Sequence, residues 1–406
     1  MVRSPARREQ ALRRRSSRPA VLVNDSPRQR ALRTLRRWIA SGVLPEGERL
    51  PSEHALASRL GVSRSTVHLA LEALEAEGLL RPLAGRGRAV ARATGDRDVM
   101  SQTIAILTDV PGETLGRARR VEGWEAFVHV GALGAAHDAG LHALTLEPRR
   151  VEAGALSSLL AQRPKGVIAL YDVTRSAAGL GLLSALHKGG VPLVVYGDER
   201  GTSAYDRVVS DHEAGSYELT RWLVGQGRRR ILRYWQLFWP DYNDRPAWLA
   251  ARDAGHERAM RDSGLETLPP LVTPSLNYGC ARREEFEMCA RMVAGYLVEA
   301  FARYPDVDAI MAASDGLVRP LAAACRILGK RPNVDIAIVG YDDYWQECPE
   351  RDWENTAPLA TVSKQNTRIG RELVELLLAR IGGRLSPAPE RRVVEPVLKV
   401  LGLGEC

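Results

Sequence analysis

The chain has 406 residues, more than one ordinary hydrophobic core holds, so we expect two or three domains. Hydrophobic residues make up 45% and charged residues 26%, as in soluble globular proteins, and no apolar run is long enough to span a membrane. The chain starts without the apolar segment of a secretory signal, and its five cysteines lack the spacing of a metal site or a disulfide scaffold, which predicts a cytoplasmic protein without a bound metal.

The charge is concentrated at one end of the chain. Residues 1–92 hold 19 arginines, no lysine and eight acidic residues, a formal charge of +11, so the remainder carries −3 of the net +8. A basic module on a near-neutral body is typical of a protein that binds a polyanion. Residues 1–25 precede the first helical pattern and are predicted to be a disordered basic tail, which either contacts the polyanion or is only solvated.

The pattern of residues 26–92 predicts three helices followed by a β-hairpin. Apolar residues recur at three- and four-residue steps from Ser26 until Gly42 ends the first helix. Ser52 is expected to cap a second helix, Gly61 to supply the turn, and Ser63 to cap a third helix. The segment "LLRPLAGRGRAVAR" then reads as two short strands that form a hairpin, or wing.

This arrangement has the geometry of a DNA reader. A recognition helix enters the major groove with its N-terminal residues, here Arg64, Ser65, Thr66 and His68, while the preceding helix crosses the backbone. Arg64 could bond to guanine with both ends of its guanidinium, and Thr66 could touch a base edge or a phosphate. An arginine at the tip of the wing could enter the minor groove or hold a phosphate.

The run "LPEGERLPSEHALASRLGVSRSTVHLALEALEAEGLLRPLAGRGRAVA" resembles the winged helix-turn-helix of the GntR family across some fifty residues. That family commonly has arginine where this chain has His54 and His68, a departure that puts the usual operator sequence in doubt but leaves DNA binding in place. The resemblance implies a set of residues that contact double-stranded DNA: Ser52, Glu53, His54, Ser63, Arg64, Ser65, Thr66, His68, Gly85, Arg86 and Gly87.

Residues 93–101 are predicted to be a short polar linker, and residues 102–406 a second domain. Apolar β-branched runs such as "TIAILTDV", "PLVVYGDE" and "DIAIVGYDD" alternate there with helical patterns. This alternation predicts an α/β fold with a doubly wound parallel sheet, which binds ligands at the carboxyl ends of its strands. The expected helices cover residues 121–139, 178–189, 212–226, 247–263, 284–303 and 316–328.

The order of these elements is similar to the two-lobed, periplasmic-binding-protein-like sensor of the LacI/GalR family. The matching segments are "VVSDHEAGSYELTRWLVGQGRRRIL", "RDAGHERAMRDSGL", "VDAIMAASDGLVRPLAAACRILGKRPNVDIAIVGYDD" and "APLATVSKQNTRIGRELVELLLARI". The resemblance implies a first lobe of about residues 102–210 and 357–383, and a second lobe of about 211–356 and 390–402. A small effector would bind between the two lobes.

The same resemblance assigns residues to the effector. Arg252 matches the arginine that pairs with ligand hydroxyls, and Asp342 matches an aspartate that accepts from them. Ser314 and Asp315 stand where the family usually has Asn-Asp. An arginine opposite a carboxylate suits a polyhydroxy ligand, because both make directional charge-assisted hydrogen bonds. The remaining candidates are a first-lobe carboxylate at a strand end and two aromatic residues that either stack on a sugar or belong to the core, namely Asp109, Trp235 and Trp239.

These features predict a transcriptional regulator, most simply a repressor of carbohydrate uptake or catabolism genes. It would bind a palindromic operator as a symmetric homodimer, and sugar in the cleft would change the placement of the two readers. The family's hinge helix is replaced here by the linker, so control would pass through dimer geometry.

Three alternatives remain open at this stage. The effector could be a nucleoside or an amino acid. A GntR-type reader can also be fused to an aminotransferase-like enzyme, but none of the lysines of the second domain has a context typical of a pyridoxal phosphate Schiff base, so we expect no cofactor and no catalysis. A transport receptor is disfavoured by the DNA reader and by the missing signal segment.

Overall fold

The computed structural model describes residues 26–45, 47–77, 79–83, 87–91, 99–108, 123–147, 164–237, 242–274, 280 and 282–401. The chain divides into two compact units, Met1–Asp98 and Val99–Cys406. The predicted tail and residues 93–98 of the predicted linker lie outside the described residues, while its last residues belong to a 3-10 helix, η1 (Val99–Gln102). Within the described part of the chain, no helix is both long and apolar enough to cross a membrane.

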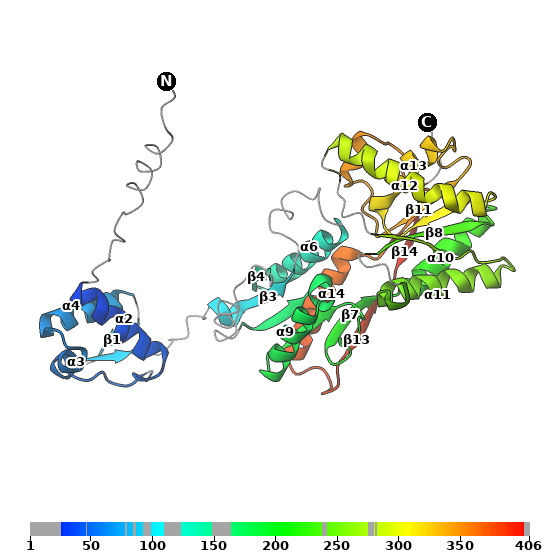
Figure 1. Cartoon of the computed structure of the whole chain (residues 1–406). Helices are drawn as coiled ribbons and strands as arrows, with labels where there is room; N and C mark the ends of the chain where they lie inside the picture. Colours follow the sequence, from blue (N-terminus) through cyan, green and yellow to red (C-terminus); the bar gives the residue numbers. More distant parts are fainter. Residues whose placement is uncertain are drawn as a thin grey trace, which may run out of the picture. The chain divides into compact units, whose positions relative to one another are not determined.

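The first unit is the predicted winged helix-turn-helix. It contains α2 (Pro27–Ala40), α3 (Glu53–Leu60), α4 (Arg64–Ala76), β1 (Leu80–Pro82) and β2 (Arg88–Val90), and the two strands pair antiparallel as the wing (Figure 1). Leu35, Leu56, Val67, Leu71 and Leu74 are buried in its core.

The helix starts follow from local hydrogen bonds that the sequence predicts. The hydroxyl groups of Ser26, Ser52 and Ser63 accept hydrogen bonds from backbone amides in the first turns of α2, α3 and α4. Gly61 has a φ of 65°, a left-handed conformation that lets α3 end and the chain turn into α4. These caps and the turn are confirmed, and they fix the angle at which α4 leaves α3.

The second unit has two lobes, each built on a six-stranded sheet. The sheet of the first lobe has the order β13-β7-β6-β5-β3-β4 and is parallel throughout. Its elements are β3 (Thr103–Leu107), α6 (Gly123–Asp138), β4 (His142–Leu146), β5 (Gly166–Ala169), α8 (Tyr171–Thr174), α9 (Ala177–Lys188), β6 (Leu193–Tyr196), β7 (Asp206–Ser210), α14 (Asn366–Ile381) and β13 (Arg391–Val394).

The sheet of the second lobe has the order β14-β12-β11-β10-β8-β9, and only β14 runs antiparallel to its neighbour. Its elements are α10 (His212–Gly225), β8 (Ile231–Leu237), η2 (Tyr242–Asp244), α11 (Ala247–Asp262), β9 (Leu271–Pro274), α12 (Arg283–Arg303), β10 (Ala309–Ala312), η3 (Asp315–Leu317), α13 (Val318–Ile327), β11 (Ala337–Tyr341), η4 (Pro349–Asp352), β12 (Ala360–Ser363) and β14 (Val397–Val400). The expected α/β fold with a two-lobed parallel-sheet domain is thereby confirmed.

The chain crosses between the lobes three times, and the sequence-based boundaries are wrong at two crossings. β12 was expected in the first lobe but pairs with β11 and β14 in the second, whereas β13 was expected in the second lobe but pairs with β7 in the first. Strand pairing depends on partners far along the chain, so an apolar run alone does not reveal which sheet a strand joins.

Helix α14 crosses to the first lobe and packs closely along α6 (Figure 1). A Cβ atom at Gly370 would lie 2.0 Å from the carbonyl oxygen of Val128, and one at Gly131 would lie 2.1 Å from the carbonyl oxygen of Thr367. Glycine at both positions therefore permits the close approach of the two helices. This contact holds the start of α14 at the junction of the two lobes.

Candidate functional site

The N-terminal end of α4 presents an exposed group of hydroxyls and one arginine. The Oγ of Ser63 lies 2.9 Å from the Oγ of Ser65 and 2.7 Å from the Oγ1 of Thr66. The side chain of Arg64 is 76% exposed. A helix N-terminus carries unpaired amides and a partial positive charge, so hydroxyls and a guanidinium there form a surface that attracts phosphate groups.

Glu53, the first residue of α3, binds three cationic side chains from two other elements. Its carboxylate oxygens lie 3.2 Å from the Nε of Arg64, 2.8 Å from the Nδ1 of His68 and 3.3 Å from the Nη1 of Arg88. Sequence analysis groups Glu53 with the residues that contact DNA. In the structure its charge is engaged by its neighbours, so Glu53 is placed to orient Arg64 and His68.

The other predicted DNA contacts lie around this group. Ser52 is exposed and its Oγ accepts from the amide of Ala55, and His54 is exposed in the first turn of α3. Gly87, at the wing, has a φ of 123°, and a Cβ atom there would meet the guanidinium of Arg49 at 3.0 Å. Gly85 and Arg86 lie outside the described residues.

In the second unit, the predicted pair of Arg252 and Asp342 is brought together and joined by Lys364. The Oδ1 of Asp342 lies 3.1 Å from the Nη2 of Arg252 and 3.0 Å from the Nζ of Lys364. All three side chains are buried. Arg252 comes from α11, Asp342 follows β11, and Lys364 follows β12, so the carboxyl ends of two neighbouring strands and one helix build this triad.

The triad is enclosed by aromatic rings from both lobes. The guanidinium carbon of Arg252 lies 3.4 Å from the ring centroid of Tyr341 and 4.6 Å from that of Trp248, and the Nζ of Lys364 lies 3.4 Å from the ring centroid of Trp124. Trp124 belongs to the first lobe, where it packs against Tyr171 and Tyr196. The surroundings of the triad thus combine hydrogen-bonding charges with aromatic faces.

One hydrogen-bonded chain links the lobes beside the triad. The Nε1 of Trp248, in the second lobe, donates to the Oη of Tyr171 in the first, and that hydroxyl donates to Glu199. The amide of Ala247 also donates to Glu199, at 3.4 Å. These contacts hold the two lobes together around the triad, so opening or closing of the cleft would break or form them.

Burial and nearby charges set the protonation of the groups around the triad. Burial, with the charges of Arg252 and Lys364, holds the pKa of His212 well below its ordinary value. A neutral His212 can accept the hydrogen bond from the Nε of Arg252, at 3.3 Å. Burial also raises the pKa of Tyr196 and of Tyr341, so both phenols keep their protons.

The backbone at Asp342 is held in a strained conformation. Its φ of 91° is rarely adopted by a residue with a side chain. Its amide donates to the carbonyl of Val362 at 2.8 Å, and the Nδ2 of Asn366 donates to its carbonyl at 2.8 Å. Neighbouring elements therefore impose the conformation that aims the carboxylate at Arg252 and Lys364.

Asp315 and Ser314, also predicted to bind the effector, bind neighbouring residues of the second lobe. The carboxylate of Asp315 is fully buried and accepts from the amides of Tyr344 and Trp345 and from the hydroxyl of Thr361, at 2.8 to 3.2 Å. The Oη of Tyr344 donates to the Oγ of Ser314. Asp315 thus fastens the loop after β11 to the end of β10.

Replacing Asp315 by asparagine is expected to stabilise the protein increasingly as the pH rises from 5 to 8. Burial raises the pKa of Asp315 from 3.8 to about 8, so the wild-type chain loses stability over this range, because folding disfavours the charged carboxylate. The asparagine amide can donate to Thr361 and its oxygen can still accept from both backbone amides. Melting temperatures of the two proteins at several pH values measure the effect; a difference that does not grow with pH contradicts it.

The prediction for Trp235 is wrong. Its side chain is fully buried in the core of the second lobe, and its Nε1 donates to the Oδ1 of Asp253 at 2.9 Å. Asp253 also forms a buried ion pair with Arg233, at 2.6 Å. Trp235 is therefore a core residue of the second lobe. Asp109 and Trp239 lie outside the described residues.

Four residues around the triad were not predicted from the sequence, namely His212, Trp124, Trp248 and Lys364. Lys364 was considered only as a possible Schiff-base lysine, and His212, Trp124 and Trp248 fell within helical patterns. One available signal for Lys364 was its place directly after an apolar strand run, next to Gln365. The sequence alone does not reveal which lobe or which partner each of these side chains contacts.

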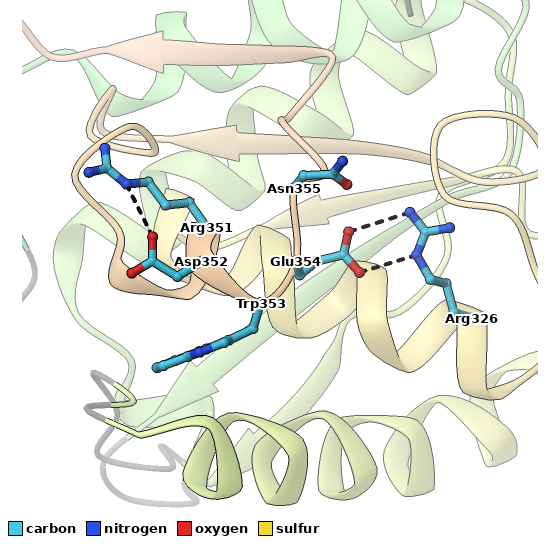
Figure 2. Close-up of a pocket in the computed structure, with 6 residues that line it drawn as sticks. All are labelled: Arg326, Arg351, Asp352, Trp353, Glu354 and Asn355. Atoms are coloured by element: carbon cyan, nitrogen blue, oxygen red, sulfur yellow. Dashed lines mark hydrogen bonds and ion pairs between the residues drawn. The ribbon is translucent and has the colours of Figure 1, made fainter.

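A separate cavity lies on the second lobe, with a volume of about 510 Å³ (Figure 2). Its charged groups are paired with one another, since Arg326 lies 3.1 Å from Glu354 and Arg351 lies 3.8 Å from Asp352. The cavity shares no residue with the predicted effector site. The lining residues are Arg326, Arg351, Asp352, Trp353, Glu354 and Asn355.

Comparisons with known proteins agree with both units. Residues 27–90 match the family described as bacterial regulatory proteins, gntR family, and residues 220–400 match a periplasmic binding protein-like domain. An arabinose metabolism transcriptional repressor of Geobacillus stearothermophilus is 26% identical over 355 residues, which cover 86% of this chain and 89% of that protein.

Two further matches describe a regulator called CelR. The CelR protein of Thermobifida fusca is 31% identical over 222 residues, which cover 54% of this chain and 58% of that protein. The solved structure of a CelR–cellobiose complex has a TM-score of 0.55 and 23% identity, and the match covers 86% of this chain and 99% of that one. At this level of identity the structural match shows a shared fold.

Proposed function

Because this chain carries a gntR-family helix-turn-helix at residues 27–90 and a periplasmic-binding-protein-like domain at residues 220–400, we propose that it is a transcriptional regulator controlled by a sugar-like effector. It binds operator DNA through α4 and the wing, in the cytoplasm, and represses genes of carbohydrate uptake or catabolism. Catalysis and a cofactor form no part of this proposal.

The observation that carries the effector assignment is the buried triad of Arg252, Asp342 and Lys364. An ionised carboxylate between two cations offers both an acceptor and donors to the paired hydroxyls of a sugar. The rings of Trp124 and Trp248 beside it suit the apolar faces of a sugar ring. An arabinose-metabolism repressor and a regulator solved with cellobiose, both similar to this chain, support the same ligand class.

The effector can control DNA binding when two copies of the chain form a symmetric dimer. Two recognition helices then occupy successive major grooves of a palindromic operator, and cleft closure changes their separation. Val130 and Leu133 on the outward face of α6, with exposed fractions of 56% and 36%, support a self-associating surface. Because the coupling is reciprocal, an effector that releases the operator is itself bound less tightly by the DNA-bound protein.

A thermal-shift screen against monosaccharides, disaccharides, sugar acids, nucleosides and amino acids tests the effector. A ligand at about a hundred times its dissociation constant should add about 2.7 kcal/mol to the free energy of unfolding. Selection of duplexes from a random library tests the reader independently. A response only to nucleosides or amino acids would replace the sugar assignment, and failure to enrich any DNA sequence would contradict the regulator itself.

A further inference from the structure

Both ring nitrogens of His68 face carboxylates. Its Nδ1 lies 2.8 Å from the Oε1 of Glu53, and its Nε2 lies 3.2 Å from the Oε1 of Glu72. A neutral imidazole donates from one nitrogen only, whereas the protonated ring donates from both. Two facing carboxylates therefore favour the protonated ring, and they raise the pKa of His68 above the ordinary value of 6.5, Glu53 foremost.

His68 belongs to a small ionic cluster on the surface predicted to meet DNA. Glu53 of α3 also binds Arg64 of α4 and Arg88 of the wing, and Arg88 in turn binds Glu75 of α4. While His68 holds its proton, the negative charges of the three carboxylates are balanced by three positive charges, those of Arg64, Arg88 and His68. When the proton is lost, the cluster keeps one uncompensated negative charge beside the path of the DNA backbone.

We propose that His68 is a titratable DNA contact of the reader and that Glu53 is the positioning residue that sets the pH at which this contact is lost. The proposal rests on the function proposed above, because it presupposes that α4 lies against DNA. Arg64 and His68 are four residues apart and share one face of α4. Below its pKa, His68 supplies the charge that arginine supplies at this position elsewhere in the gntR family.

The sign of the pH effect follows from the charge of the folded form. Protonated His68 attracts a phosphate and completes the charge balance of the cluster, so DNA affinity is highest at low pH. As the pH rises through the raised pKa of His68, the attraction is lost and the one uncompensated negative charge of the cluster repels the backbone. Since the group is exposed, added salt weakens the effect.

The experiment measures DNA affinity of the full-length protein from pH 5.5 to 9 at constant ionic strength. The probe is a 30-base-pair duplex recovered by selection from a random library with the same protein. We expect DNA affinity to fall about tenfold from pH 5.5 to 9. The slope of log affinity against log salt concentration should be smaller in magnitude by about one at the high-pH end, because one phosphate contact is lost.

Three variants separate the contact from its positioning. His68→Arg should bind at every pH without the decline, and His68→Gln should bind weakly at every pH. Glu53→Gln should move the midpoint of the decline to lower pH, because it removes the main cause of the raised pKa. A purely structural role of Glu53 would lower affinity without moving the midpoint.

The outcomes distinguish this inference from the function on which it rests. If selection recovers no duplex, the regulator function itself fails. If a duplex binds with pH-independent affinity, or if the decline persists in His68→Arg, the regulator stands and the role of His68 is overturned. If the decline of DNA affinity with pH persists in His68→Arg but disappears in His54→Gln, the residue responsible is His54 on α3 and not His68.

Discussion

Replacing Arg252 by alanine is expected to weaken effector binding by about thirtyfold or more and to abolish the effect of the ligand on DNA binding. The buried guanidinium donates to Asp342 and to the carbonyl of Ala313 and is stacked on Tyr341. Its removal takes away the N–H groups that would donate to the hydroxyls of the sugar. It also leaves the buried acceptors without their donor, a change that typically costs about 2–5 kcal/mol. Isothermal titration with the sugar that gives the largest thermal shift measures the loss.

Arg258→Ala is a matched control on the same helix. Arg258 is 42% exposed and pairs at the surface with Glu213, so its removal should leave effector affinity unchanged. Melting temperatures of both variants show whether the fold survives. If Arg252→Ala is folded and binds the sugar as the wild type does, the effector site lies elsewhere and the proposed cleft is wrong.

Replacing Arg64 by alanine is expected to weaken operator binding about tenfold to a hundredfold and to relax the preference at one base pair. The side chain is 76% exposed at the N-terminal end of α4, where a guanidinium can bond to a guanine edge with two hydrogen bonds. Because Arg64 pairs with Glu53 at the surface, the melting temperature of the variant should change little. Anisotropy titrations against the selected duplex and its single-base variants measure both effects.

Arg36→Ala provides the control for charge alone. Arg36 pairs with Glu77 beside the opposite end of α4, so this variant removes one positive charge from the same unit without touching the recognition surface. It should bind the selected duplex nearly as the wild type does. If Arg36→Ala and Arg64→Ala lose DNA affinity equally and base preference stays unchanged, Arg64 contributes only a general electrostatic attraction to DNA.

Local signals in the sequence predicted most elements of this protein. The serine caps of α2, α3 and α4 and the turn at Gly61 depend on contacts within a few residues, so their pattern is visible in the chain itself. The predicted helix at 247–263 corresponds to α11 (Ala247–Asp262), and the predicted helix at 178–189 corresponds to α9 (Ala177–Lys188). The family pattern singled out Arg252 and Asp342 as effector contacts, and the structure adds that they form an ion pair with each other.

The sequence by itself determined the winged helix-turn-helix and the α/β class of the second unit, and the family pattern singled out Arg252 and Asp342 as candidates. Only the tertiary structure decided that β12 and β13 exchange lobes, that Trp235 is a core residue, that Lys364 completes the triad and that Glu53 gathers Arg64, His68 and Arg88. The physical reason is distance along the chain. Arg252 and Asp342 are 90 residues apart, and such contacts are set by sheet pairing and packing between elements rather than by neighbouring residues.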